Sequence, residues 1–167
     1  MVSPSSPVLP MGVVRGQKNP LHFGFAERLR RARKAVSLTK GGLAIAAGLG
    51  RNALYGLESG ERIPRVDTVE LLADALHVSP CWLAFGVELA WSPAQARRCG
   101  EIAQRLRQAR TARAVSTRAL GRDSGTSDTT VRLTETGETI PSIAKVEAIA
   151  VALRVSACWL AFGVGDC

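Results

Sequence analysis

The sequence predicts an all-α protein composed of two tandem five-helix domains joined by a short linker. The first observation is a repeat: residues 25–86 align without a gap to residues 102–163, at an offset of 77 positions, and 27 of the 62 aligned residues are identical. Self-similarity of this length indicates one folding unit used twice. The second observation is that the identical residues fall where a small helical domain needs apolar contacts, caps and turns. Each copy contains five helical segments and no strand.

The long helices are marked by apolar residues at helical spacing. In copy one the first helix carries them at Phe25, Leu29, Ala32 and Val36, with arginines between them. The fourth helix carries them at Val69, Leu72, Ala73 and Leu76. Spacings of three and four residues place one apolar stripe on each helix, directed toward a core. Ser79 caps and Pro80 opens a short fifth helix.

The second and third helices are short, and a glycine turn joins them. Thr39 caps the second helix, which runs through Ala47, and Gly48 supplies the left-handed turn that ends it. The third helix is expected at residues 51–59 and stops at Gly60. Copy two repeats these signals at Ser116, Gly125, Ser127, Gly137 and Ser142.

These signals divide the chain into four parts. They are a flexible N-terminal arm at residues 1–22, domain 1 at residues 23–87, a linker at residues 88–92 and domain 2 at residues 93–167. The arm contains four prolines and no helical period. Ser92 followed by Pro93 is typical of a helix start, so the first helix of domain 2 is expected to run from Pro93 to about Arg113. A linker this short would hold one domain in a defined orientation against the other.

The chain is strongly basic. Its net charge is +8 with a pI near 10.2, and 18 of its 22 basic residues are arginine, whose planar guanidinium suits phosphates and guanine edges. The two copies carry +3 and +4 of this charge, so the charge belongs to the domains rather than to a tail. This distribution favours an anionic partner.

Other classes of protein find little support in the sequence. It has no run of about 18 apolar residues and no signal-peptide pattern at its start, so a cytoplasmic protein without a membrane contact is expected. Cys81 and Cys158 occupy equivalent positions without a CxxC motif, which favours small buried side chains over a metal site or a disulfide. No catalytic Ser/His/Asp set, carboxylate pair or phosphate-binding glycine loop is present, so neither an enzyme nor a cofactor is expected.

Two short helices joined by a glycine turn, with an amphipathic helix ahead of them, are the parts of a helix-turn-helix reader of DNA. Copy one reads TKGGLAIAAG, LESGERIP and VSPCWLAFG, and copy two reads STRALGRDSG, TETGETIP and VSACWLAFG. In these motifs the chain resembles the Cro and lambda-repressor family (XRE type) of DNA-binding domains. The resemblance covers both copies and implies a lambda-repressor-like helix-turn-helix fold for each.

The resemblance also implies roles for particular residues. In this family the first turns of the third helix read bases, which gives Arg51, Asn52, Tyr55 and Gly56 in copy one and Asp128, Thr129 and Arg132 in copy two. The start of the second helix holds a phosphate, which gives Lys40 in copy one and Thr117 with Arg118 in copy two. An arginine of the first helix pairs with the glutamate that closes the third, as Arg33 with Glu58 and Arg110 with Glu135, and this pair is structural.

Some residues depart from the family pattern. Asp128 brings a negative charge to a surface where DNA phosphates would crowd, and Thr134 replaces the apolar residue that Leu57 supplies in copy one. The second helix of copy one is poor in polar side chains, which suits either a protein contact or close packing on the DNA backbone.

The function expected from these observations is that of a sequence-specific DNA-binding transcriptional regulator whose tandem domains read two half-sites of double-stranded DNA. The alternative is a protein-binding antiactivator or antirepressor, which would hold another regulator through the second helix of domain 1. A homodimer, which would present four domains, is a further alternative.

Overall fold

The computed structural model describes residues 20–90 and 101–165 of the 167-residue chain. Module one contains α1 (Pro20–Phe23), α2 (Phe25–Ala35), α3 (Lys40–Ala46), α4 (Arg51–Ser59), α5 (Val66–Leu76) and α6 (Pro80–Phe85). Module two contains α7 (Ile102–Ala112), α8 (Thr117–Ser124), α9 (Asp128–Glu135), α10 (Ile143–Leu153) and α11 (Ala157–Phe162). Within the described ranges the only β-type pairing is an isolated bridge between Arg65 and Ser142. The prediction of an all-α fold with two five-helix repeats, α2–α6 and α7–α11, is confirmed.

The caps and turns follow local rules that the sequence predicts. The Thr39 hydroxyl accepts the backbone N–H of Gly42 at 3.0 Å at the start of α3, and Ser116 makes the equivalent cap on α8. Gly48 (φ 65°) and Gly125 (φ 67°) leave these helices in the left-handed conformation. A Cβ at either glycine would meet open space, so glycine is favoured there by the backbone angle rather than by crowding.

The structure describes module two from Glu101 onward. Within the described residues the first helix of module two begins at Ile102, after a single turn-like residue at Glu101. The predicted start at Pro93 and residues 91–92 of the predicted linker lie outside the described residues. Contacts between the two modules are present in the described residues, and the orienting role of the linker stays a prediction.

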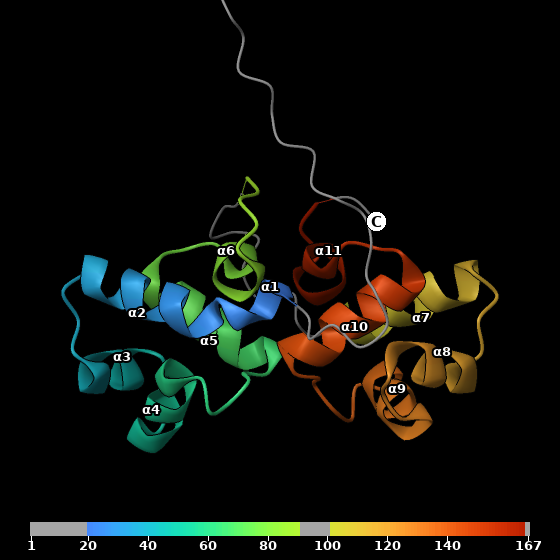
Figure 1. The fold of residues 1–167 in the computed structure, drawn as a ribbon, viewed down its shortest axis with the longest axis horizontal. Coiled ribbons are helices and arrows are strands. Elements are labelled where there is room, and N and C mark those ends of the chain that lie inside the picture. The colour runs from blue at the N-terminus through green and yellow to red at the C-terminus, as the bar shows by residue number, and fades with distance from the viewer. Residues whose placement is uncertain (1–19, 91–100, 166–167) are drawn as a thin grey trace, which may run out of the picture.

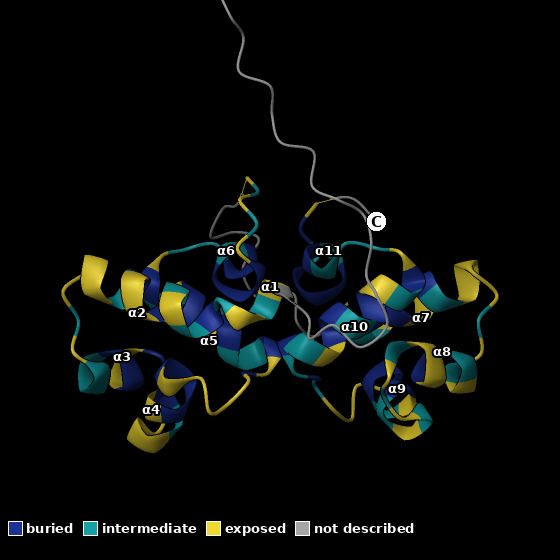
Figure 2. Cartoon of the chain, viewed as in Figure 1, coloured by how far each residue is buried: buried dark blue, intermediate teal, exposed yellow. Residues whose placement is uncertain are grey.

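Each module packs around its fourth repeat helix. Helix α5 contacts α3 and α6, and α10 contacts α8 and α11. Leu72 in α5 and Ile149 in α10, which are equivalent positions, are 0% and 1% exposed. Burial of one such side chain contributes about 1.5 to 3 kcal/mol. Figure 2 shows the buried residues along the inner sides of the helices and the exposed ones along their outer sides.

The two modules meet in a reciprocal interface. The Val66 N–H donates to the carbonyl of Pro141 at 3.1 Å, and the Ile143 N–H donates to the carbonyl of Pro64 at 3.0 Å. Val66 and Ile143 are equivalent residues of the repeat, and so are Pro64 and Pro141. Each module therefore gives and receives the same bond. Reciprocity of this kind defines an isologous interface, which in other proteins joins two identical chains. Here it joins two halves of one chain.

Side chains complete the junction between α6 and α11, which pack against each other at the centre of the molecule (Figure 1). The rings of Phe85 and Phe162 lie 6.2 Å apart at an interplanar angle of 50°, and each residue is 2% exposed. Cys81 and Cys158 are buried as free thiols, as the sequence predicts. The hydrogen bond that the Cys81 thiol donates to Cys158, together with burial, raises the pKa of Cys81.

Helix α1 has no counterpart among the predicted helices. The arm predicted for residues 1–22 overlaps it, and residues 1–19 lie outside the described residues. The ring of His22 contacts the Glu147 carboxylate of α10 at 2.8 Å, and the His22 N–H donates to the same oxygen at 3.3 Å. The Glu147 side chain is 3% exposed. A partner 125 residues away orders this turn, which explains why local sequence gives no sign of it.

The junction places α4 and α9 on one side of the molecule. In Figure 1 these helices lie at the left and right ends of the lower edge, whereas α6 and α11 lie together above them. The third helix of each repeat therefore faces the same way as the other. None of the helices in the described ranges combines the length and apolarity that crossing a membrane requires.

Candidate nucleic-acid interface

Helices α3 and α4 of module one form a compact angle around Gly48. The two helices pack against each other, and Leu43 and Leu54 fill the space between them at 0% exposure. Helix α4 begins after Gly50, which provides no side-chain cap, and ends at Gly60 with φ 81°. No side chain caps its first turn, which begins with the two polar residues Arg51 and Asn52. Both of these side chains are exposed.

A buried ion pair fixes each of these third helices to the first helix of its repeat. Arg33 donates to both carboxylate oxygens of Glu58, at 2.6 and 3.2 Å, and Arg110 does the same with Glu135 at 2.6 and 2.8 Å. The side chains of Glu58 and Glu135 are 1% and 6% exposed. The hydrogen bond to the glutamate raises the pKa of each arginine, so both remain charged. These pairs are structural, as the resemblance implies.

Another equivalent pair of arginines serves the fold rather than the surface. Arg28 donates to the carbonyls of Leu83 and Ala84 at 2.9 and 2.7 Å, where α6 ends. Arg105 makes the equivalent bonds at the end of α11, at 3.0 and 2.8 Å. Arginine near a helix C-terminus satisfies carbonyls that lack a helical partner. The donors of these two guanidinium groups are therefore engaged within the modules.

Most of the predicted DNA-binding residues of module one have accessible side chains. Arg51 and Asn52 are exposed, and Tyr55 is 53% exposed. The Lys40 ammonium lies 4.5 Å from the centre of the Tyr55 ring and 3.7 Å from Glu58. Lys40 thus links the start of α3 to the face of α4, and its side chain remains 37% exposed. An open polar hollow of about 500 Å³ lies beside this contact.

Gly56 behaves differently from its predicted neighbours. It is buried, and the side chain that covers it belongs to Arg62, in the loop after α4. A Cβ at Gly56 would lie 2.9 Å from Cδ and 3.0 Å from Cγ of Arg62. The direct base contact expected at this position therefore has no side chain of its own, and Arg62 occupies the space.

The predicted contact residues of module two differ in their exposure. Arg118, Thr129 and Arg132 are exposed, whereas Thr117 is half-buried. Asp128 is the first residue of α9, where its charge is favoured by the helix dipole. Its Oδ1 atom is buried and has no hydrogen-bond partner among the described residues. Thr134 is 1% exposed and returns its hydroxyl to the carbonyl of Thr130 at 2.8 Å, so the polar residue in this core position is satisfied.

Helices α8 and α9 approach each other closely through Gly121. A Cβ at Gly121 would lie 2.8 Å from the backbone nitrogen of Asp128 and 3.1 Å from the carbonyl carbon of Ser127. The equivalent residue of module one is Ala44, which is 1% exposed. The backbone of α9 therefore leaves no room for a Cβ at position 121, and glycine is the residue that allows this approach.

A family model described as a helix-turn-helix domain matches the chain twice, over residues 25–84 and 101–160. Together the two matches cover more than half of the chain. The chain is a tandem helix-turn-helix protein. Each match contains the ion pair, the glycine turn and the third helix described above. Neither the curated proteins nor the solved structures gave a match.

Membership of the helix-turn-helix family confirms the resemblance to XRE-type domains and supports a DNA-binding regulator in general. It is a family of regulatory domains and not of enzymes. The individual DNA contacts remain predictions for both helix-turn-helix domains.

One residue of the surface was not predicted. Arg62 stands outside α4, so a search confined to the third helix passes over it. A glycine at position 56, followed six residues later by an arginine, is the only local sign of this contact. That sign is weak, because the packing of the loop against the helix is decided by tertiary structure.

Proposed function

We propose that this tandem helix-turn-helix protein is a sequence-specific transcriptional regulator that acts as a covalent pseudo-dimer and reads two unlike half-sites on one duplex. The observation that carries the proposal is the reciprocal junction, which leaves α4 and α9 at opposite ends of the same side of the molecule (Figure 1). Helix-turn-helix dimers place two such helices in successive major grooves, about 34 Å apart along the DNA. An imperfect palindrome of about 20 bp or less would fit this arrangement.

The proposed contacts follow the chemistry of the exposed side chains. Arg51 and Asn52 begin α4, and these residue types pair bidentately with guanine and adenine, respectively. Thr129 and Arg132 take the corresponding positions in module two. We assign phosphate contacts to Lys40 in module one and to Thr117 and Arg118 in module two. The different residues of α4 and α9 support half-sites of different sequence.

The junction also supports a monomer as the binding species. In a conventional dimer, the α6 surface of one chain would be covered by the same surface of a second chain. Here α11 covers it, and Phe85 is 2% exposed as a result of both its own core and this contact. A homodimer would need a different surface.

Selection from random DNA sequences by the purified full-length protein tests the proposal. At about 150 mM salt, where non-specific phosphate binding is weakened, we expect enrichment of one motif with two unlike halves. Footprinting combined with the mass of the complex in solution would then show one chain covering both halves. Failure to enrich any motif would remove sequence-specific DNA binding as the main function.

A variant at Arg51 tests the assignment of individual contacts. Arg51→Ala should weaken binding to the selected motif by about 1 to 3 kcal/mol and relax the preference at one base pair of one half-site. Arg31→Ala removes the same charge from an exposed position of α2 that does not line the polar hollow, and serves as the control. An equal loss for Arg51→Ala on every DNA sequence would assign Arg51 to phosphate instead.

A protein-binding antiactivator or antirepressor remains the second candidate, because one observation favours it. Ile45 is 74% exposed on α3, beside the glycines of a helix whose only charged residue is Lys40. An exposed branched apolar side chain at this position suits a protein contact better than a phosphate. The same selection experiment separates the two candidates, since a protein-binding function predicts no enriched motif.

A further inference from the structure

The loop after α4 contributes a side chain to the surface of that helix. The Arg62 N–H donates to the carbonyl of Gly56 at 2.9 Å, which anchors the loop on the helix. The aliphatic part of Arg62 then lies across Gly56, at the distances of 2.9 and 3.0 Å given above for a Cβ at that position. Any larger residue at position 56 would displace Arg62. The glycine therefore gives the arginine its place.

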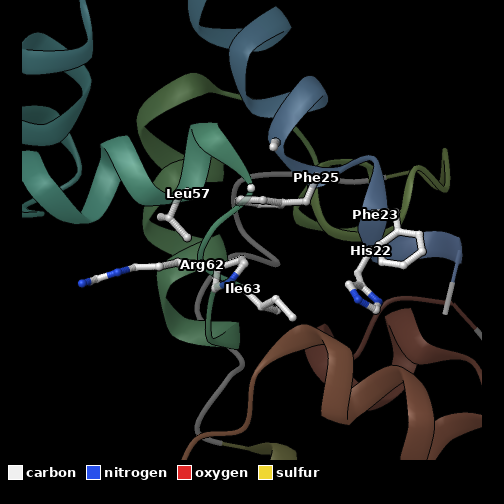
Figure 3. Close-up of a pocket in the computed structure, with 9 residues that line it drawn as sticks. His22, Phe23, Phe25, Leu57, Arg62 and Ile63 are labelled. Atoms are coloured by element: carbon white, nitrogen blue, oxygen red, sulfur yellow. The ribbon is translucent and has the colours of Figure 1, made fainter. Parts of the chain in front are cut away.

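Arg62 lies on the face of α4 that carries the predicted contacts. Asn52, Tyr55, Gly56 and Ser59 share one side of the helix, because they are spaced by three and four residues. All four line the polar hollow together with Arg62. In Figure 3 the Arg62 side chain extends away from His22 and Phe23, whereas the neighbouring Ile63 does not follow it. Arg62 also borders the small pocket drawn in Figure 3, but its guanidinium end points away from the aromatic side chains of that pocket.

The charges around Arg62 leave its guanidinium available. Glu58 also lines the hollow, but Arg33 binds both of its carboxylate oxygens. Arg62 is exposed and makes no ion pair with the residues that the structure describes. Its planar fork of donors is therefore free to meet a ligand with paired acceptors, such as the O6 and N7 atoms of guanine.

Module two keeps the backbone anchor of the loop, because the Thr139 N–H donates to the carbonyl of Leu133 at 3.1 Å, but its side chains differ. The residues at the corresponding positions are Leu133 in place of Gly56 and Thr139 in place of Arg62. Leucine leaves no room over the helix, and threonine has neither the reach nor the charge. The two modules therefore differ in charge and in side-chain length at this point of the surface.

We propose that Arg62 reads a base edge in the half-site bound by module one, in place of the side chain that Gly56 lacks. The inference rests on the proposed DNA-binding function and extends it to a residue outside the third helix. It gives module one a specificity determinant that module two does not possess.

The test uses the full-length protein and the motif that it selects. Arg62→Ala should lower the affinity for this motif about 5- to 150-fold and relax the preference at one base pair of the half-site of module one. The preferences in the other half-site should not change. Arg62→Lys should retain affinity for unrelated DNA but lose the same preference, because lysine keeps the charge without the fork. Arg31→Ala is the charge-matched control and should alter no preference.

Gly56→Ala tests whether the glycine positions the arginine. The new Cβ displaces Arg62 while adding a residue that favours helix, so the melting temperature should not fall. Affinity for the motif should nevertheless fall several-fold, with the same base-pair preference relaxed. Adding Arg62→Ala to Gly56→Ala should cause less further loss than Arg62→Ala causes alone.

The outcomes separate this inference from the proposed function. If the wild-type protein enriches no motif, both fail. If it enriches a motif that the Arg62→Ala variant binds with unchanged affinity and preference, the inference fails while the proposed function stands. A loss that is equal on all DNA sequences, with a smaller dependence on salt, would also overturn it, since Arg62 would then bind phosphate.

Discussion

The contact between Phe85 and Phe162 allows a direct test of the junction in solution. Each ring is almost fully buried, and the two are equivalent residues of α6 and α11 that meet at 6.2 Å. We choose Phe→Leu at each position, alone and together, because leucine keeps most of the apolar volume but removes the aromatic pair. Truncation to alanine would leave a cavity large enough to unfold a small module.

The magnitude of the expected coupling follows from this geometry. Each single substitution should lower the free energy of unfolding by about 1 to 2 kcal/mol, the range for a modest loss of volume in a core. Rings at this separation interact by about 0.5 to 1.5 kcal/mol beyond their burial, and either substitution removes that interaction entirely. The double variant should therefore lose less than the sum of the two single losses, by about 1 kcal/mol.

Urea denaturation followed by circular dichroism and by tryptophan fluorescence gives the four free energies. Trp82 and Trp159 each lie three residues before one of the phenylalanines and report on the same helices. A control cycle combines Phe85→Leu with Val131→Ala in α9, which belongs to the other module and is away from α6 (Figure 1). Distant sites add to within about 0.5 kcal/mol. If the losses for Phe85→Leu and Phe162→Leu also added to within this range, the two rings would not be in contact. That result would refute the junction between the modules and the pseudo-dimer that depends on it.

Two other predictions concern packing and thiol chemistry. Gly121→Ala should lower the melting temperature, because overpacking against the backbone of Asp128 costs about 1 to 3 kcal/mol. The gain in helix propensity is at most about 1 kcal/mol and does not offset this cost. An unchanged or higher melting temperature would mean that α8 and α9 do not approach each other this closely at Gly121. In a Cys99→Ser, Cys167→Ser background, Cys81 and Cys158 should react with a thiol reagent at about pH 8 only after denaturant is added, because burial and the raised pKa of Cys81 suppress the thiolate. Rapid labelling of the native protein would show that the junction is open.

Several features of the candidate site follow from local sequence. Thr39 and Ser116 cap their helices because a hydroxyl at that position accepts a nearby N–H, whatever the rest of the chain does. Gly48 and Gly125 turn the chain because only their backbone enters the left-handed region without cost. The left-handed turns at Ser37 and Ala114 were not predictable in this way, since nothing in either residue type favours φ 56° or 53°.

The surface itself was only partly predictable. Exposure of Arg51 and Asn52 agrees with their position in the first turn of an amphipathic helix. The partner of Gly56 was not foreseeable, because the identity of a side chain over a glycine depends on the path of the following loop. The role of each arginine was not predictable from the net charge: the guanidinium groups of Arg28 and Arg105 donate to carbonyls of α6 and α11.

The sequence by itself determined that this protein is a repeated set of five helices with capped ends and glycine turns, because helical period, capping and left-handed turns act over a few residues. Only the tertiary structure decided how the two sets meet. The hydrogen bonds between Val66 and Pro141 and between His22 and Glu147 join residues far apart in the chain. Each bond contributes little stability by itself, and no local sequence pattern marks its two residues as partners. They form because many buried side chains close the junction together, and that closure sets the direction in which α4 and α9 face.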